Sequence, residues 1–234
     1  MTNSSRAVLL CAAFVCFAVW SGCGSATQEA ERALTRGLKA GHEGDHVRAA
    51  EEYTAAIQLR PDYAEAFNNR GLAYAKQGRF YRAIADYQQA IQLQPEFAEA
   101  YNNLGNAFAH LGDNAQAIVN FTAAIRIKPT AGAFNNRGTA HRNRKEIAPA
   151  IADCSEAIRL NPRFAPAYYN RGNAYGDQGQ LDAAIADYTS AIEHQPEFAQ
   201  AYYNRGVSYA AQNDSAKSAA DIARAAELGF PPKK

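Results

Sequence analysis

The segment His42-Glu43-Gly44-Asp45-His46 contains the residue types of a metal-dependent hydrolase. It matches the H-E-x-x-H pattern, in which two histidines one helical turn apart bind zinc and the glutamate acts on the zinc-bound water. That chemistry needs an unbroken helix through the segment and a third metal ligand. No third ligand is evident in the sequence, so the elements that carry these residues decide whether they form a site.

A fixed period organises the chain from residue 30 onward. Asn-Arg-Gly recurs at 69–71, 136–138, 170–172 and 204–206, and a proline recurs at the same interval from Pro61 to Pro196. The interval is 34 residues, apart from one unit of 33 residues at 98–130. A period of this length predicts an array of stacked hairpins.

The units resemble tetratricopeptide repeats. Their eighth residue is always glycine, from Gly37 to Gly206, and their twenty-seventh is always alanine, from Ala56 to Ala225. We place six repeats at 30–63, 64–97, 98–130, 131–164, 165–198 and 199–232. The resemblance implies an all-α, right-handed solenoid of six helix-turn-helix hairpins.

Glycines and aspartates indicate where each hairpin turns. A left-handed residue that ends the first helix is expected at Gly44, Gly78, Gly112, Gly179 and Asn213. Asp45, Asp113 and Asp214 follow directly and can cap the second helix. The histidines of the H-E-x-x-H pattern should therefore lie on different helices, and we predict no metal site there.

Arginine recurs at position seven of the repeats, where the family usually has leucine, and an acid recurs at position twenty-three. The pairs are Arg36 with Glu52, Arg70 with Asp86, Arg137 with Asp153, Arg171 with Asp187 and Arg205 with Asp221. The third repeat has Leu104 and Asn120 instead, so it lacks both charges. We interpret each pair as a structural bridge between the two helices of one repeat.

Amides occupy positions that face the inner wall in tetratricopeptide proteins. They are Asn69, Asn103, Asn136, Asn170 and Asn204 at position six and Asn68, Asn102 and Asn135 at position five, where the last two repeats have Tyr169 and Tyr203 instead. A primary amide offers donors and an acceptor to a peptide backbone. The row resembles the asparagine rows that grip extended polypeptides, which predicts a peptide-binding surface. The alternative is that these amides satisfy groups between helices.

Composition and cysteine positions exclude other functional classes. The 234 residues carry a net charge of +1, which excludes a dominant basic surface for nucleic acid. Cys154 is the only cysteine in the repeats, and both it and His141 stand at positions that are normally aromatic, so we expect them to pack. No phosphate loop or catalytic triad stands out. We expect no enzyme activity, cofactor, metal or small-molecule substrate.

The first 22 residues resemble a signal peptide of the bacterial lipoprotein type. Ala7 to Trp20 carry no charge but span only roughly 21 Å as a helix, against the roughly 30 Å of a bilayer core. Ser21-Gly22-Cys23 resembles a lipobox, although Trp20 departs from it. The resemblance implies acylation of Cys23, a short linker at 23–29, and a place at the periplasmic face of the outer membrane.

The expected function is a membrane-tethered scaffold that binds an extended segment of a partner protein and recruits it at the bacterial envelope. Two alternatives stay open. One is a structural protein of the envelope that associates with itself. The other is a cytosolic adaptor of the co-chaperone type, which the chain fits less well because Glu65 and Glu99 stand where a carboxylate clamp needs basic residues.

Overall fold

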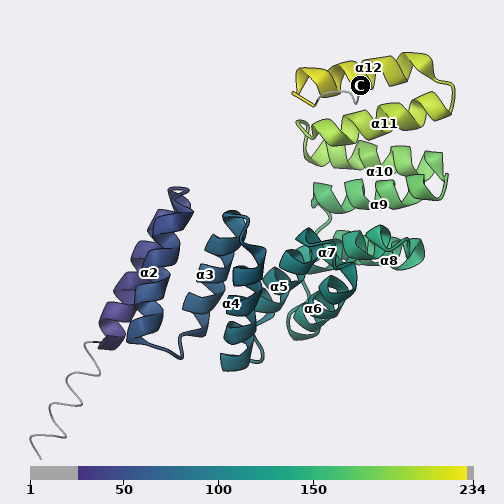
Figure 1. The fold of residues 1–234 in the computed structure, drawn as a ribbon. Coiled ribbons are helices and arrows are strands. Elements are labelled where there is room, and N and C mark those ends of the chain that lie inside the picture. The colour runs from purple at the N-terminus through teal and green to yellow at the C-terminus, as the bar shows by residue number, and fades with distance from the viewer. Residues whose placement is uncertain (1–25, 231–234) are drawn as a thin grey trace, which may run out of the picture. The chain divides into compact units, whose positions relative to one another are not determined.

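A computed structural model describes residues 26–230, and all regular secondary structure in that range is helical (Figure 1). The predicted all-α fold of consecutive helix hairpins is confirmed. The chain forms two compact units, one ending at Ala100 and the other beginning at Tyr101.

The first unit contains the first two hairpins. A helix over residues 26–42 precedes α2 (His46–Leu59), α3 (Ala64–Lys76) and α4 (Phe80–Leu93), and α3 packs against both α2 and α4. Its core is built from alanines around a few larger side chains such as Tyr53 and Tyr63, both at least nine-tenths buried. Small residues let the helices lie close together, and the rings fill the remaining space.

The second unit contains the remaining hairpins. Its helices are α5 (Ala98–His110, which begins just before the boundary), α6 (Asn114–Ile127), α7 (Ala131–Asn143), α8 (Ile147–Leu160), α9 (Ala165–Asp177), α10 (Leu181–His194), α11 (Ala199–Ala211) and α12 (Ser215–Glu227). From α6 onward each helix packs against the next in chain order. The first helices α7, α9 and α11 also contact one another in series, which brings equivalent residues of consecutive repeats together.

The turns inside the hairpins have the predicted geometry. Gly44, Gly78, Gly112 and Gly179 all adopt positive φ, as does Asn213. The side chains of Asp45, Asp113 and Asp214 accept hydrogen bonds from backbone N–H groups three residues on. In the fourth repeat Lys145 occupies this left-handed position with φ of 65°, a conformation that strains a side chain with a Cβ.

In the first, second, third and fifth repeats, glycine at position eight lies against an aromatic ring that leaves no room for a Cβ. A Cβ added at Gly71 would stand 2.7 Å from the ring of Tyr87, which is a clash. Gly172 and Tyr188 repeat this contact. In the fourth repeat the smaller Cys154 takes the place of the ring, and burial raises the pKa of its thiol to about 12.

The predicted signal peptide and Cys23 lie outside the described residues, as do positions 231–234. Within residues 26–230, no helix has the length and apolar character required to cross a bilayer. The predicted repeat boundaries stay predictions, although the helices α3, α5, α7, α9 and α11 begin at the residues where we place the second to sixth repeats.

Candidate protein-binding surface

Each arginine of the second, fourth, fifth and sixth repeats forms a two-pronged ion pair with the acid on the neighbouring helix. Arg70 Nε and Nη2 donate to the two carboxylate oxygens of Asp86 at 2.8 and 2.7 Å. The same geometry joins Arg137 to Asp153, Arg171 to Asp187 and Arg205 to Asp221. These guanidinium groups also lie 5.4 to 5.8 Å from the centre of an aromatic ring one turn earlier.

The ion pairs are largely shielded from water. The arginine side chains are 16 to 22% exposed and the acids 8 to 11%. Hydrogen bonding to the carboxylate raises the pKa of Arg70, Arg171 and Arg205, while burial opposes the rise. A shielded, doubly hydrogen-bonded pair joins the two helices in each of these four repeats.

The third nitrogen of each guanidinium reaches the preceding repeat, a contact that our sequence analysis missed. Nη1 donates to a hydroxyl at position twenty-five: Arg70 to Thr54, Arg137 to Thr122, Arg171 to Ser155 and Arg205 to Thr189, at 3.0 to 3.1 Å. We call the arginine, its acid and this hydroxyl the arginine tie. Because it spans two repeats, the tie fixes the stacking of hairpins as well as their internal packing.

The first and third repeats differ. Arg36 donates to Glu52 at 2.7 Å and turns its Nη1 to Glu29, because no repeat precedes it, and its side chain is 46% exposed. Leu104 is 4% exposed. Asn120 is buried and its amide donates to the backbone oxygen of Gln116 on its own helix.

Amides of consecutive first helices in the second unit are joined to one another. Asn136 Nδ2 donates to Asn102 and Asn106 at 3.4 and 3.2 Å, and Asn170 Nδ2 donates to Asn135 at 2.8 Å. Asn204 Nδ2 donates to the Tyr169 hydroxyl and to Asn173 at 3.1 and 2.8 Å. We call Asn136, Asn170 and Asn204 the amide row. Their Nδ2 groups donate to side chains of the preceding repeat, as expected of amides that satisfy groups between helices.

The remaining residues predicted to bind peptide are spread over both units. Asn68 is 1% exposed and donates to the half-buried Asn69 at 3.4 Å. Asn103 is half-buried, and the ring of Tyr203 packs against Phe230 at 5.2 Å. Asn68 and Asn135 are buried, and each is hydrogen-bonded to another amide of the predicted set, Asn69 and Asn170 respectively.

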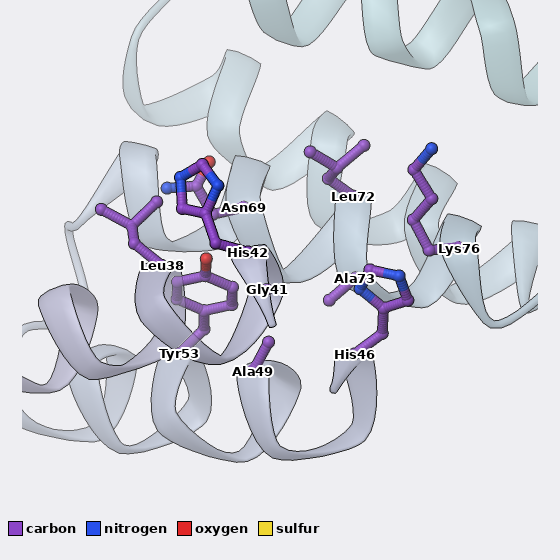
Figure 2. Close-up of a pocket in the computed structure, with 10 residues that line it drawn as sticks. All are labelled: Leu38, Gly41, His42, His46, Ala49, Tyr53, Asn69, Leu72, Ala73 and Lys76. Atoms are coloured by element: carbon purple, nitrogen blue, oxygen red, sulfur yellow. The ribbon is translucent and has the colours of Figure 1, made fainter. Parts of the chain in front are cut away.

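A pocket of about 210 Å³ opens in the first unit between the helix over residues 26–42, α2 and α3 (Figure 2). Its lining residues are Leu38, Gly41, His42, His46, Ala49, Tyr53, Asn69, Leu72, Ala73 and Lys76. Of these, only Asn69 belongs to the peptide-binding residues predicted from the sequence. Leu38 and Leu72, both at position nine, are 38 and 40% exposed. This pocket gives the surface of the first unit an apolar site.

The H-E-x-x-H pattern does not assemble a metal site. His42 is the last residue of its helix, Gly44 adopts φ of 81°, and His46 begins α2, so the histidines lie on different helices (Figure 2). In the described part of the chain, no group of three metal-ligating side chains comes together. His141, which we expected only to pack, also pairs its Nδ1 with Glu146 at 2.6 Å.

Models described as TPR repeat match residues 43–78, 71–112 and 138–179, and a tetratricopeptide repeat model matches residues 98–130 and 165–198. Neither describes a catalytic domain. Searching curated proteins gives no significant match.

Many solved structures resemble the chain. YrrB, a TPR protein with an unusual peptide-binding site, is 26% identical with a TM-score of 0.61, covering 76% of this chain and 93% of its own. MamA is 28% identical with a TM-score of 0.62, over 68% and 94%. PilW, a type IV pilus biogenesis factor, is 19% identical with a TM-score of 0.79, over 88% and 95%, and shows the fold alone. The family matches cover more than half of the 234 residues, and the chain therefore belongs to the tetratricopeptide repeat family of protein-interaction modules.

Proposed function

We propose that this protein is a non-enzymatic scaffold that binds an extended segment of a partner protein along the first helices of its repeats. The amide row carries the proposal. Asn136, Asn170 and Asn204 are half-buried and recur at one-repeat spacing, and each directs its donor to the preceding repeat. Each of these amides also carries an acceptor oxygen, Oδ1, which can accept from the N–H groups of a partner backbone.

The similarity to YrrB supports this function, because that protein is a TPR protein with a peptide-binding site and resembles this chain at 26% identity. Backbone recognition by a row of acceptors would give affinity with little dependence on the partner's side chains. Selectivity must then come from elsewhere on the surface.

We further propose that Cys23 is acylated and holds the scaffold at the outer membrane of a bacterial envelope, where it acts as an adaptor. The uncharged run before Ser21-Gly22-Cys23 supports this placement. Acyl chains can anchor a protein whose net charge is close to zero. Cells fed radiolabelled palmitate should label the wild-type protein and not the Cys23→Ser variant. Equal labelling of both would refute the anchor.

Affinity capture tests the binding surface. The full chain, immobilised in detergent, should retain envelope proteins that the double variant Asn136→Ala/Asn170→Ala retains several-fold less. Asn143→Ala is the matched control, since its exposed amide lies on the same helix α7 but bonds to Asn114. Mass spectrometry identifies the partner, and circular dichroism checks that helix content is unchanged. Equal capture by all three proteins would assign the amides a structural role only.

A further inference from the structure

Position nine of the repeats is apolar in some repeats and polar in others. It is Leu38 and Leu72 in the first two repeats and Val207 in the sixth, whereas in the third, fourth and fifth it is Asn106, Thr139 and Asn173. Leu38 and Leu72 flank the pocket of the first unit and keep more than a third of their surface exposed. Apolar side chains placed at the mouth of a pocket favour an apolar occupant.

The pocket suits one side chain. Its volume of about 210 Å³ lies below the roughly 300 to 1,000 Å³ of pockets that hold whole small molecules. Most of its wall is carbon, from Leu38, Leu72, Ala49 and Ala73, and the ring of Tyr53 lies between them in Figure 2. A partner residue with an aliphatic or aromatic side chain would replace water there.

The charge around the pocket is positive at one end. Lys76 is the charged side chain of the lining, which contains no carboxylate. Burial raises the pKa of Tyr53, and the negative charge of Glu65 on α3 adds to that rise. Glu65 stands eleven residues before Lys76, which is about 16 Å along a helix. A carboxylate in the partner would therefore be attracted to the Lys76 end.

We infer that this pocket receives a single apolar side chain of the partner segment, and that an adjacent acidic residue of the partner pairs with Lys76. The inference rests on the proposed function and supplies the selectivity that the amide row lacks. The apolar wall and the charge of Lys76 both favour a protein segment in which an apolar residue stands next to an acidic one.

Four labelled peptides test it. Each is a nine-residue Gly/Ser chain with Phe-Asp, Phe-Asn, Ala-Asp or Ala-Asn at its centre. Binding to the full chain in detergent micelles is followed by fluorescence polarisation, with empty micelles as the blank. We expect the Phe-Asp peptide to bind about tenfold tighter than Ala-Asp, because burying the ring contributes most, and about threefold tighter than Phe-Asn. Equal affinity for all four would overturn the inference.

Variants separate the two contacts. Leu72→Asn introduces the residue found at the equivalent position of the fifth repeat and should remove the preference for Phe over Ala. Lys76→Gln should remove only the preference for Asp over Asn. Val207→Asn, at the equivalent exposed position of the sixth repeat, is the control and should change neither. Unchanged preferences in Leu72→Asn would refute the assignment of the pocket.

The outcomes distinguish this inference from the function on which it rests. If the full chain captures partners through the amide row but shows no peptide preference, the pocket assignment is wrong and the scaffold function stands. If both capture and peptide binding fail, the proposed function fails. If light scattering shows that the chain self-associates and Leu72→Asn makes it monomeric, the occupant is a second copy and the inference is overturned.

Discussion

In the second, fourth, fifth and sixth repeats an arginine joins an acid on the next helix to a hydroxyl of the preceding repeat, whereas the third repeat has Leu104 and Asn120 at the same positions. The arginine tie and the pair of Leu104 with Asn120 both occur in the same type of helix hairpin. The apolar version buries a leucine, and its amide is satisfied by its own helix. The third repeat therefore shows that the two helices can pack without the charges. A shielded arginine, in contrast, destabilises the fold unless its charge and its N–H groups have partners.

Removing one acid should have the largest effect. Asp187→Ala leaves the shielded guanidinium of Arg171 without its carboxylate, and we expect a loss of about 3 kcal/mol in the free energy of unfolding. Urea unfolding followed by circular dichroism measures it. The control is Arg171→Leu/Asp187→Asn, which copies the third repeat and should fall within about 1 kcal/mol of wild type. A double variant as unstable as Asp187→Ala would break the comparison.

The reverse change should harm the third repeat. Leu104→Arg buries a guanidinium beside Asn120 without an acid, and we expect a loss of about 2 kcal/mol in the free energy of unfolding. Adding Asn120→Asp should restore part of that loss. If Leu104→Arg alone is neutral in the same urea experiment, the arginine does not need its carboxylate.

The hydroxyl of the tie should contribute less. Thr189→Val keeps the shape of the side chain but removes the acceptor for Arg205 Nη1, at an expected cost of about 1 kcal/mol in unfolding free energy. Thr139→Val is the matched control, because its hydroxyl bonds to a carbonyl of its own helix and not to an arginine. Equal effects of the two substitutions would show that the hydroxyl does not tie repeats together.

The exposed pair of the first repeat should matter least. Arg36→Ala removes contacts to Glu52 and Glu29 that water and salt can replace, so its effect on unfolding should be smaller than that of Thr189→Val. The effect should also vanish in 1 M NaCl, while that of Asp187→Ala persists. A salt-independent effect of Arg36→Ala would mean that the terminal pair acts like an inner tie.

Much of the fold follows from the sequence because each hairpin repeats the same local signals. The glycines before Asp45 and Asp113 predict the turns, and the position-eight glycines predict close helix packing. Comparison of the repeats also predicts the pairing of Arg70 with Asp86 from the sequence alone. The hydroxyl partner could also have been predicted by comparing repeats. Each arginine of the fourth to sixth repeats has a threonine or serine at position twenty-five of the repeat before it, whereas the repeat before Leu104 has Gln88 there.

Other features depend on side-chain directions that a pattern does not contain. Asn136 donates to two amides of the preceding repeat, but its sequence position alone fits a surface amide equally well. The pocket needs Leu38 and Leu72, on two different helices, to line the same space as Tyr53, which the repeat pattern does not indicate. Lys145 at φ of 65° breaks the glycine rule, so the turn of the fourth repeat could be located only from its neighbours.

The arginine tie gives the array a polarity. Each guanidinium bonds toward the N-terminal neighbour, so among the groups of the tie, deleting the sixth repeat would leave only the Thr189 hydroxyl without its partner, and water can satisfy it. Deleting the first repeat would instead take Thr54 away from Arg70 and leave a shielded cationic N–H group without its acceptor. Shortened versions of this protein should therefore tolerate trimming from the C-terminal end better than from the N-terminal end.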